Sequence, residues 1–317
     1  MSITTTHFGP GGVVLANGAV DKTGKGAYRW LDVARPTEEE LLWLQDTYNF
    51  HPLTIEDCRH FNQRAKVEEY DGYLFITMVI PHASANGEDM EADELHSYLG
   101  HEYLVTVHDD PLPALDLVRQ RLLADRGKAK TSSDFLLYLI SDQLVDRYFP
   151  LLDDIEDEIG VLEDKIIERP DRDTLSRIFT LKQQLVYMRK TAGPERDVFH
   201  ALSGRRFPEV SARSELYFRD IYDHLVRIYE GIETSRDLLS NALDAYLSVV
   251  SNRLNEVMKR LTVIATIFMP LSFIVGFGGM NLQQLPFGNW LFFGTIMAAI
   301  VLTPLTMLFW FSRRDWM

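Results

Sequence analysis

The chain has 317 residues, of which 46% are hydrophobic and 25% charged, and its formal net charge is −14. This mixture is typical of a globular protein with one or two domains. The acidic balance argues against nucleic acid as a partner, and the single cysteine excludes an intramolecular disulfide framework and a cysteine-rich zinc site.

Residues 1–130 predict an α/β domain. Three stretches have the aromatic and β-branched content of strands: 66–70, 73–81 and 95–108. A helix is expected at 37–49, which opens with a capping-box pattern, and another at 112–127, which ends on glycine. The glycine-rich stretch 9–12 is not followed by Gly-Lys-Ser/Thr, so we expect no nucleotide as a cofactor.

Residues 131–211 predict a pair of antiparallel helical arms. The first arm is expected to lead to Pro170 and the second to Gly193 and Pro194, with a short turn between the two arms. The end of the first arm is strongly acidic, which favours a solvated helix face; the acids are Asp153, Asp154, Glu156, Asp157, Glu158, Glu163 and Asp164.

Residues 212–260 predict a stalk helix that continues into an uncharged segment. At a rise of 1.5 Å per residue, the helix from about residue 214 to 280 would be roughly 100 Å long. A helix of this length cannot be covered by its own domain, so we expect it to pack in an oligomer.

Two segments, 261–280 and 290–311, contain no charged residue. Each has about the 20 residues that a helix needs to cross a bilayer core of ~30 Å, so both are predicted to be transmembrane helices. Lys259 and Arg260 precede the first, and the basic tail 312–317 follows the second. This pattern predicts that both termini are cytoplasmic and that the uncharged loop 281–289 lies outside.

The N-terminus has no pattern of a cleavable signal peptide. We therefore expect a multi-pass protein of the cell inner membrane whose N-terminal domain is cytosolic. The segment 259–317 contributes a charge of +3, so residues 1–258 carry −17. Such a domain indicates cations as ligands or partners, although acidic side chains also simply keep a domain soluble.

One face of the long helix is polar in its first part and small or flexible in its second, at spacings of three and four residues. Its residues are Asp237, Asn241, Asp244, Ser248, Ser251, Asn255, Met258, Leu261, Ala265, Met269, Ser272 and Gly276. For 237–251 alone, plain solvent exposure is the simpler interpretation. The continuation into the uncharged segment favours the wall of a water-filled pore, with an apolar constriction at Met258 and Leu261.

The stretch 260–281, RLTVIATIFMPLSFIVGFGGMN, resembles the first transmembrane helix of the CorA magnesium transporters, which ends in Gly-Met-Asn. Here that signature is Gly279, Met280 and Asn281. Further stretches are similar to the same family: 168–170, 217–224, 236–261 and 312–316. The resemblance extends from about residue 51 to the C-terminus and is weakest in the first 50 residues.

The resemblance implies an α+β cytosolic domain with a long helical stalk and two C-terminal transmembrane helices, assembled in the lipid membrane as a funnel-shaped homopentamer. The selectivity filter would be Gly279, Met280 and Asn281. The pore-lining residues, matched by position, would be Asn255, Met258, Leu261, Met269, Ser272 and Gly276, with Asp244 at the cytoplasmic mouth. Asp220 would belong to a regulatory metal site between subunits, where the candidate acids opposite it are Asp89, Glu88 and Glu91.

Two features depart from the family pattern. The family usually has an aromatic residue directly before Gly-Met-Asn, whereas this chain has Gly278 there and Phe277 one place earlier. The loop 281–289 carries no acid, although acids are frequent there in magnesium transporters of this type, and uncharged loops also occur in the related ZntB-like zinc transporters.

The resemblance implies a channel-like transporter for Mg²⁺, and also for Co²⁺ or Ni²⁺, that is driven by the membrane potential and gated by intracellular Mg²⁺. The alternative on the same scaffold is a Zn²⁺ transporter of the ZntB-like branch, with or without coupling to protons. The nine histidines do not cluster: His96, His101 and His108 fall on predicted strands, and His51 and His60 on predicted helices. A membrane-anchored sensor would leave the polar face unexplained, and no set of nucleophile and base indicates an enzyme.

Overall fold

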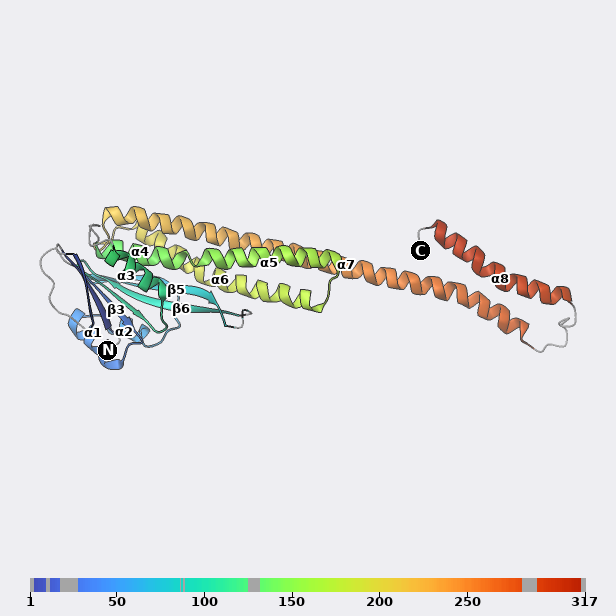
Figure 1. Ribbon diagram of the computed structural model, residues 1–317, viewed down its shortest axis with the longest axis horizontal. Helices are drawn as coiled ribbons and strands as arrows, with labels where there is room; N and C mark the ends of the chain where they lie inside the picture. Colours follow the sequence, from blue (N-terminus) through green and yellow to red (C-terminus); the bar gives the residue numbers. More distant parts are fainter. Residues whose placement is uncertain are drawn as a thin grey trace. The chain divides into compact units, whose positions relative to one another are not determined.

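The computed structural model describes residues 3–9, 12–17, 28–85, 87, 89–124, 132–280 and 290–314. The chain divides into two compact units. The first comprises Met1–Lys165 and Asp171–Ala242, and the second comprises Ile166–Pro170 and Leu243–Met317. The described residues of the first unit form a sheet covered by helices, and those of the second form mainly two apolar helices (Figure 1).

A seven-stranded sheet lies at the centre of the first unit, in the order β2-β1-β3-β7-β6-β5-β4. All neighbouring strands are antiparallel except β3 and β7, which are parallel. The strands are β1 (Ile3–Gly9), β2 (Gly12–Asn17), β3 (Tyr28–Ala34), β4 (Lys66–Tyr70), β5 (Tyr73–Ala83), β6 (Met90–Leu99) and β7 (Tyr103–His108).

The sequence analysis located part of this sheet. The predicted strand 66–70 is β4, and the predicted strand 73–81 lies within β5. The stretch 95–108 covers two strands rather than one, because the chain turns at Gly100, whose N–H donates to the Tyr103 carbonyl. The Tyr103 ring lies where a Cβ on Gly100 would be, so any other residue at this turn would force that ring to shift. The strands β1 to β3 were not predicted.

One face of the sheet is covered by α1 (Glu38–Tyr48) and α2 (Pro52–Asp57) (Figure 1). The predicted capping box is confirmed: the Thr37 side chain accepts from the Glu40 N–H, and the Glu40 carboxylate accepts from the Thr37 N–H. The buried cluster under these helices contains Leu31, Val33, Leu41, Leu44, Phe50, Ile55, Phe75, Tyr98, Val105 and Val107.

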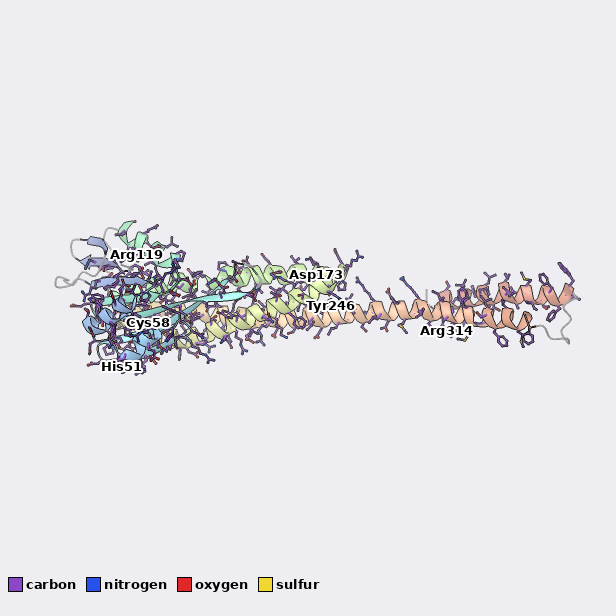
Figure 2. The ribbon with its side chains drawn as sticks, turned by 90° about the horizontal axis from the view of Figure 1, so that it is seen from below. His51, Cys58, Arg119, Asp173, Tyr246 and Arg314 are labelled. Carbon is purple, nitrogen blue, oxygen red and sulfur yellow. The ribbon has the colours of Figure 1, made fainter. Side chains whose placement is uncertain are left out.

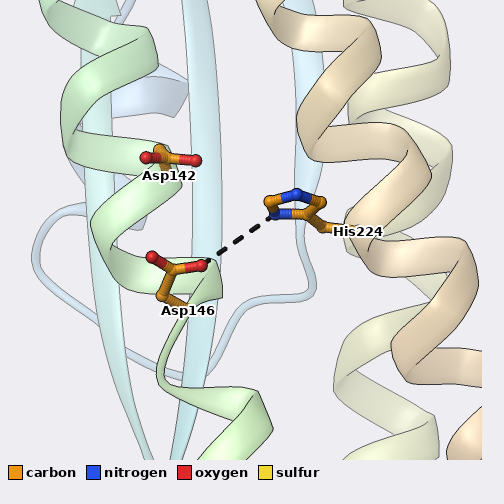
Figure 3. A group of neighbouring side chains, drawn as sticks. All are labelled: Asp142, Asp146 and His224. Atoms are coloured by element: carbon orange, nitrogen blue, oxygen red, sulfur yellow. Dashed lines mark ion pairs between the residues drawn. The ribbon is translucent and has the colours of Figure 1, made fainter.

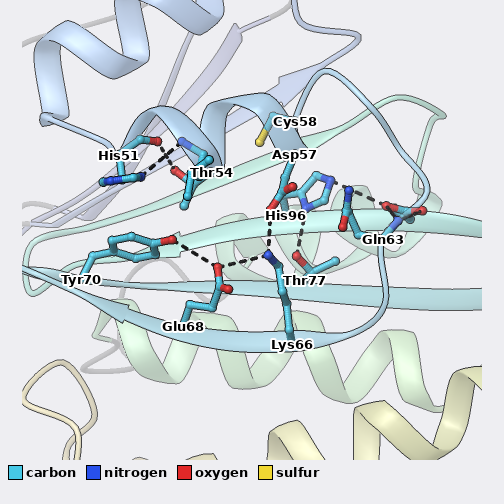
Figure 4. Close-up of polar contacts among 12 residues, drawn as sticks. His51, Thr54, Asp57, Cys58, Gln63, Lys66, Glu68, Tyr70, Thr77 and His96 are labelled. Atoms are coloured by element: carbon cyan, nitrogen blue, oxygen red, sulfur yellow. Dashed lines mark hydrogen bonds and ion pairs between the residues drawn. The ribbon is translucent and has the colours of Figure 1, made fainter.

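Polar contacts tie α2 to the sheet (Figure 4). Lys66 Nζ lies 2.8 Å from Asp57 Oδ2 and 3.1 Å from Glu68 Oε2, so one cation bridges α2 and β4. His51 is the N-cap of α2 and His60 follows that helix, so the prediction that both lie in helices was wrong. Cys58, at the end of α2, is buried beside Tyr98, and burial raises the pKa of its thiol to about 12 (Figure 2).

The other face of the sheet packs against helices that follow in sequence. They are α3 (Pro113–Ala124), α4 (Ser133–Val145), α5 (Tyr148–Glu168) and α6 (Arg172–Gly204). The Ser141 hydroxyl of α4 lies 3.4 Å from the Met78 sulfur of β5, and the α5 residue Tyr148 is fully buried. The first unit is therefore a sheet between two helical layers.

The helical arms correct two predictions. The first arm is not continuous: α4 ends at Val145 and α5 begins at Tyr148, because Pro150 has no N–H to continue the earlier helix and instead occupies the first turn of the next. The second arm does not end at Gly193 and Pro194, since α6 continues to Gly204. Its later turns bury Val198, Phe199 and Leu202, and this packing outweighs the hydrogen bond lost at the proline.

The acidic end of α5 is a solvated face, as the sequence favoured. Asp153, Asp154 and Glu156 are exposed, whereas Leu152 and Ile155 between them are buried. Glu158 is half-buried because its carboxylate pairs with Arg177 of α6.

The long helix α7 runs from Ala212 to Gly278. In the first unit its buried side chains recur at spacings of three and four residues: Phe218, Ile221, Leu225, Ile228, Ile232, Ser235, Leu239 and Ala242. Gly231 interrupts the apolar pattern for a steric reason, because a Cβ there would lie 2.5 Å from the Leu152 side chain of α5. This face is held by α5 and α6.

The second unit contains the end of α7 and α8 (Trp290–Arg313), and both are long and apolar enough to cross a membrane. The two helices lie side by side: Ile296 of α8 is next to Gly278, and Met307 borders a groove of about 410 Å³ with Leu261 and Met269. The Arg253 guanidinium of α7 donates to the Glu168 carbonyl at the end of α5.

A buried charge network fixes the parallel strand pair β3 and β7 to α3. Asp32 accepts hydrogen bonds from Thr106 at 2.8 Å and from Arg119, and lies 3.2 Å from His108 Nε2. The His108 Nδ1 is 2.6 Å from the Asp110 carbonyl, so both ring nitrogens face acceptors. Burial alone would lower the pKa of His108, but the hydrogen bond and charge of Asp32 outweigh it, and the pKa of His108 is raised.

The imidazolium of His108 therefore makes stability depend on pH. Its contribution is fully present below the pKa of an unfolded histidine, 6.5, and is lost as pH rises through the raised folded pKa. We expect the unfolding temperature of the purified chain in detergent to fall across this window, and His108→Gln to remove that part of the fall. The same pH profile in the wild type and His108→Gln would contradict the assignment.

Asp32→Asn leaves Arg119 without this buried counter-charge and should lower the free energy of unfolding by about 3–5 kcal/mol at neutral pH.

Candidate functional site

The predicted polar face of α7 is exposed along its whole length. In the first unit Asp237 and Asn241 are exposed, on the side of the helix opposite Leu239 and Ala242. In the second unit Asp244, Ser248, Ser251, Asn255, Met258, Leu261, Ala265, Met269, Ser272 and Gly276 are all exposed. No helix of the described chain covers this face.

The apolar members of the face expose much of their surface. Met258 and Leu261 are 59% and 58% exposed, and Met269 is 73% exposed. Val263 is buried, and Ile274 and Gly278 are half-buried. Ile296 of α8 lies beside Gly278, and Met307 of α8 borders the groove that Leu261 and Met269 also line. Within the described residues, α8 therefore adjoins the polar face at this groove and leaves most of that face exposed.

The helix α7 ends at the glycines of the predicted filter. The Gly279 N–H donates to the Val275 carbonyl at 2.9 Å, and the Met280 N–H donates to the Phe277 carbonyl at 3.3 Å. A Cβ on Gly279 would lie 3.3 Å from the Val275 oxygen, so glycine eases this tight last turn. Met280 is 49% exposed, and Asn281 lies outside the described residues.

The structure gives a reason for the unusual Gly278. A Cβ there would lie 3.3 Å from Ile296 Cδ1 of α8. An aromatic side chain would need the space that Ile296 occupies, so the small residue at 278 and the branched residue at 296 fit each other. Gly278, which departs from the family pattern, thus has Ile296 of the same unit as its close neighbour.

A second candidate site lies in the first unit, between α4 and α7. Asp142 and Asp146 come from α4 and the turn that follows it, and His224 comes from α7 (Figure 3). One potential ligand atom of each lies within 4.8 Å of the others. The His224 Nδ1 is 3.9 Å from Asp146 Oδ1 and has no hydrogen-bond partner in the described part of the chain.

Asp220 adjoins this cluster. Its Oδ2 lies 3.9 Å from His224 Nε2, one helical turn away on α7. Burial, and then the charges of Asp146 and Asp220, raise the pKa of Asp142. Several carboxylates therefore repel one another around one imidazole, and a divalent cation would relieve this repulsion. Carboxylate oxygens suit Mg²⁺, and an added imidazole also suits Co²⁺, Ni²⁺ or Zn²⁺.

The other predicted acids are not in this cluster. Glu91 accepts a hydrogen bond from the Ser84 hydroxyl at 2.7 Å, and the Asp89 carbonyl accepts from the Ser84 N–H at 2.9 Å. Both lie at the turn between β5 and β6. Glu88 lies outside the described residues.

The sequence analysis missed Asp142, Asp146 and His224 as candidate ligands. A signal was present, because Asp142 and Asp146 are four residues apart, as are Asp220 and His224, and each pair shares a helix face. What the sequence does not show is that α4 and α7, almost eighty residues apart along the chain, lie next to each other.

Comparisons with known proteins agree with this architecture. The family model described as CorA-like Mg2+ transporter protein matches residues 25–314. The cobalt/magnesium transport protein CorA of Thermotoga maritima is 39% identical over 272 residues, which cover 85% of this chain and 78% of that protein. The complete structure of the CorA magnesium transporter from Methanocaldococcus jannaschii superposes with a TM-score of 0.88 at 25% identity, covering 100% of this chain and 99% of that one. The zinc transport protein ZntB of Yersinia pseudotuberculosis is 26% identical, covering 91% of this chain and 88% of that protein.

The cluster of Asp142, Asp146 and His224 should bind a divalent cation. We expect Co²⁺ added to the full-length chain in detergent to give a visible absorption band that Mg²⁺ suppresses by competition. Asp146→Asn and His224→Gln should each weaken the affinity by at least the ~10-fold that loss of a supporting group costs at metal sites. Asp164→Asn, on the exposed face of α5, is the matched control. Equal Co²⁺ affinity in all four proteins would show that the cluster is not a metal site.

Proposed function

The chain belongs to the CorA family of divalent-cation transporters, and from this premise we propose that it carries Mg²⁺, and also Co²⁺ or Ni²⁺, across the cell inner membrane. The single observation that supports this most is the uncovered face of α7. It continues from Asp237 in the first unit through Met258 and Leu261 to Gly276, and its residues stay exposed although Met307 of α8 borders the groove at Leu261 and Met269.

We propose that α7 lines a central pore in a homopentamer, with α8 outside it against lipid. Exposed residues such as Asn255, Ser272 and Gly276 would then face water and ions, and Met258 and Leu261 would form an apolar constriction that can close by dewetting. Asp244 would attract cations at the cytoplasmic mouth, and the acidic N-terminal domain would raise the local cation concentration.

The proposed filter exploits the chemistry of hydrated Mg²⁺. This ion is small and gives up its water reluctantly, so a filter need not strip it. A ring of Asn281 amide oxygens would hold first-shell waters without the strong attraction of a carboxylate ring, and Gly279 gives the helix end its tight turn. A membrane potential of 100 mV supplies roughly 4.6 kcal/mol for a divalent ion, at ~2.3 kcal/mol per charge, so no nucleotide is required.

We propose that both termini lie in the cytoplasm. Arg260 precedes the first apolar segment and Arg313 follows the second, and basic residues favour the cytoplasmic side. The first unit is then cytosolic and senses intracellular Mg²⁺. Bound Mg²⁺ would screen the repulsion among Asp142, Asp146 and Asp220, together with Asp89, Glu88 or Glu91 of a neighbouring subunit, and so narrow the constriction.

A second candidate function is Zn²⁺ transport, with or without coupling to protons. Two observations favour it: the loop 281–289 has no acid, and the cluster of the first unit contains the imidazole of His224. The zinc-transport relative is less similar to the chain than the magnesium and cobalt transporter, so Mg²⁺ is the first choice. The relatives compared are transporters, and we propose no enzymatic activity.

The filter prediction concerns Asn281. In proteoliposomes with an imposed membrane potential, we expect the wild type to take up Mg²⁺ and Asn281→Ala to lose at least ~10-fold of that flux, because the amide oxygens that hold the hydrated ion are gone. Asn241→Ala, on the same helix face but in the first unit, serves as the control for a lost amide. Zn²⁺ uptake that follows a pH gradient, with little Mg²⁺ entry, would instead favour the zinc-transport function.

The gating prediction concerns Asp220. Currents through the wild type should fall as Mg²⁺ is raised on the cytoplasmic side, whereas Asp220→Ala should need a several-fold higher concentration, because one of the carboxylates that would attract and hold the ion is absent. The measurement is a concentration series in patches or planar bilayers, with Asp223→Ala on the same helix as control. If Mg²⁺ inhibits Asp220→Ala at the same concentrations as the wild type, Asp220 has no part in gating.

A further inference from the structure

The strand β5 is longer than its neighbour β4. Their pairing ends at Lys66 opposite Thr77, whereas β5 stays paired with β6 as far as Ala83. From Met78 onward, one edge of β5 therefore has no strand partner in the described chain. Unpaired backbone groups inside a protein are costly, so the N–H and C=O on this edge need other partners.

Glu195 of α6 meets this edge at Val79. The Glu195 side chain is fully buried, and its Oε1 accepts the Val79 N–H at 2.9 Å. Its Oε2 lies 3.0 Å from the Tyr148 hydroxyl, which itself lies 3.4 Å from the Val79 carbonyl. Glu195 and Tyr148 thus replace a missing strand, one facing the N–H and the other facing the C=O of the same residue.

The three contacts form a closed ring only when the carboxyl group carries a proton. A neutral Glu195 accepts from Val79 through one oxygen and donates its O–H to Tyr148, whose own proton is then free to reach the Val79 carbonyl. An ionised Glu195 can only accept, so the Tyr148 proton must turn to it, and the Val79 carbonyl loses that donor. Ionisation also leaves a buried charge, which is costly without a cation.

The surroundings of Glu195 contain no compensating charge. Among the described residues, the groups that act on its carboxyl are the Val79 N–H and the Tyr148 hydroxyl. On α6 itself, Thr191 comes one turn earlier and Tyr187 two turns earlier. Val79 and Thr191 also line a groove of about 260 Å³ whose charged members, Arg64, Glu94 and Lys190, are at a distance from Glu195.

We propose that Glu195 is a proton-dependent latch, which in its protonated form fastens α5 and α6 to the unpaired edge of β5 and which loosens when the proton leaves. Burial raises the pKa of Glu195 to about 8. The latch is independent of which cation the protein carries. It gives the first unit a sensitivity to cytoplasmic alkalinisation that is separate from its metal cluster.

The sign of the pH effect follows from the two states. An unfolded glutamate has a pKa of 4.5, and the folded one is raised to about 8. The stability that the latch contributes is therefore fully present below pH 4.5 and decreases as pH rises to about 8. Above about pH 8 it does not change further. A glutamine at 195 would accept from Val79 and donate to Tyr148 at every pH, and so should imitate the latched form.

Infrared difference spectroscopy of the full-length chain in detergent, between about pH 6 and about pH 10, tests the protonation directly. We expect a carboxylic acid carbonyl band that titrates near pH 8 in the wild type and is absent in Glu195→Gln. Glu94, whose pKa burial raises to about 7, should give a separate component, so Glu94→Gln should remove only the one that titrates lower. If the wild type shows no acid band assignable to Glu195 at about pH 6, the proposal fails.

Thermal unfolding over the same pH range provides the second readout. The unfolding temperature of the wild type should fall relative to that of Glu195→Gln until about pH 8, and then the difference should stay constant. Parallel profiles would overturn the latch. If Glu195→Gln does not fold, Tyr148→Phe takes its place: loss of the hydrogen-bond acceptor should move the Glu195 band to higher frequency, and an unmoved band would likewise overturn it.

Discussion

The structure depends on one helix with two different faces. In the first unit, α7 buries Phe218, Leu225 and Ile232 against neighbouring helices, and in the second unit Gly278 lies beside Ile296 of α8. The residues of the polar face stay exposed in the described part of the chain. An amphipathic helix normally buries one face and hydrates the other. Here the exposed face includes Met258, Leu261 and Met269, which are poorly suited to lie in water or to remain uncovered in a monomer.

The distribution of charge determines which ligands the protein attracts. The residues before the membrane segments carry −17, and most acids of α5 are exposed, so the domain has a field that attracts cations. Among the described residues, carboxylates crowd together with an imidazole where α4 meets α7. Asp142, Asp146 and Asp220 lie around His224 there, and the proposed cation would relieve the repulsion among them.

Two buried polar groups show how the first unit manages charge in its interior. Asp32 is ionised because His108 and Arg119 face it, and the network joins β3, β7 and α3. Glu195 has no such partner, so its neutral form is favoured, and it closes the edge of β5 as a hydrogen-bond donor and acceptor. Each carboxyl group would be costly in the other protonation state: Asp32 if it were neutral, and Glu195 if it were ionised. The two sites therefore manage the proton differently: His108 keeps its proton beside the ionised Asp32, whereas Glu195 is itself protonated.

The sequence by itself determined the features that depend on neighbours along the chain. The two uncharged segments, the periodic face of α7, the capping box at Thr37 and the strand at 66–70 all follow from local patterns, and the resemblance at Gly279 and Met280 gave the family. It did not predict the break before Pro150 or the continuation of α6 through Pro194, because packing of distant side chains outweighs local propensity there. Only the tertiary structure brought Asp142 to His224, Glu195 to Val79, and Gly278 to Ile296. Each of these pairs is created by helices or strands that are far apart in sequence, so no spacing in the chain records it.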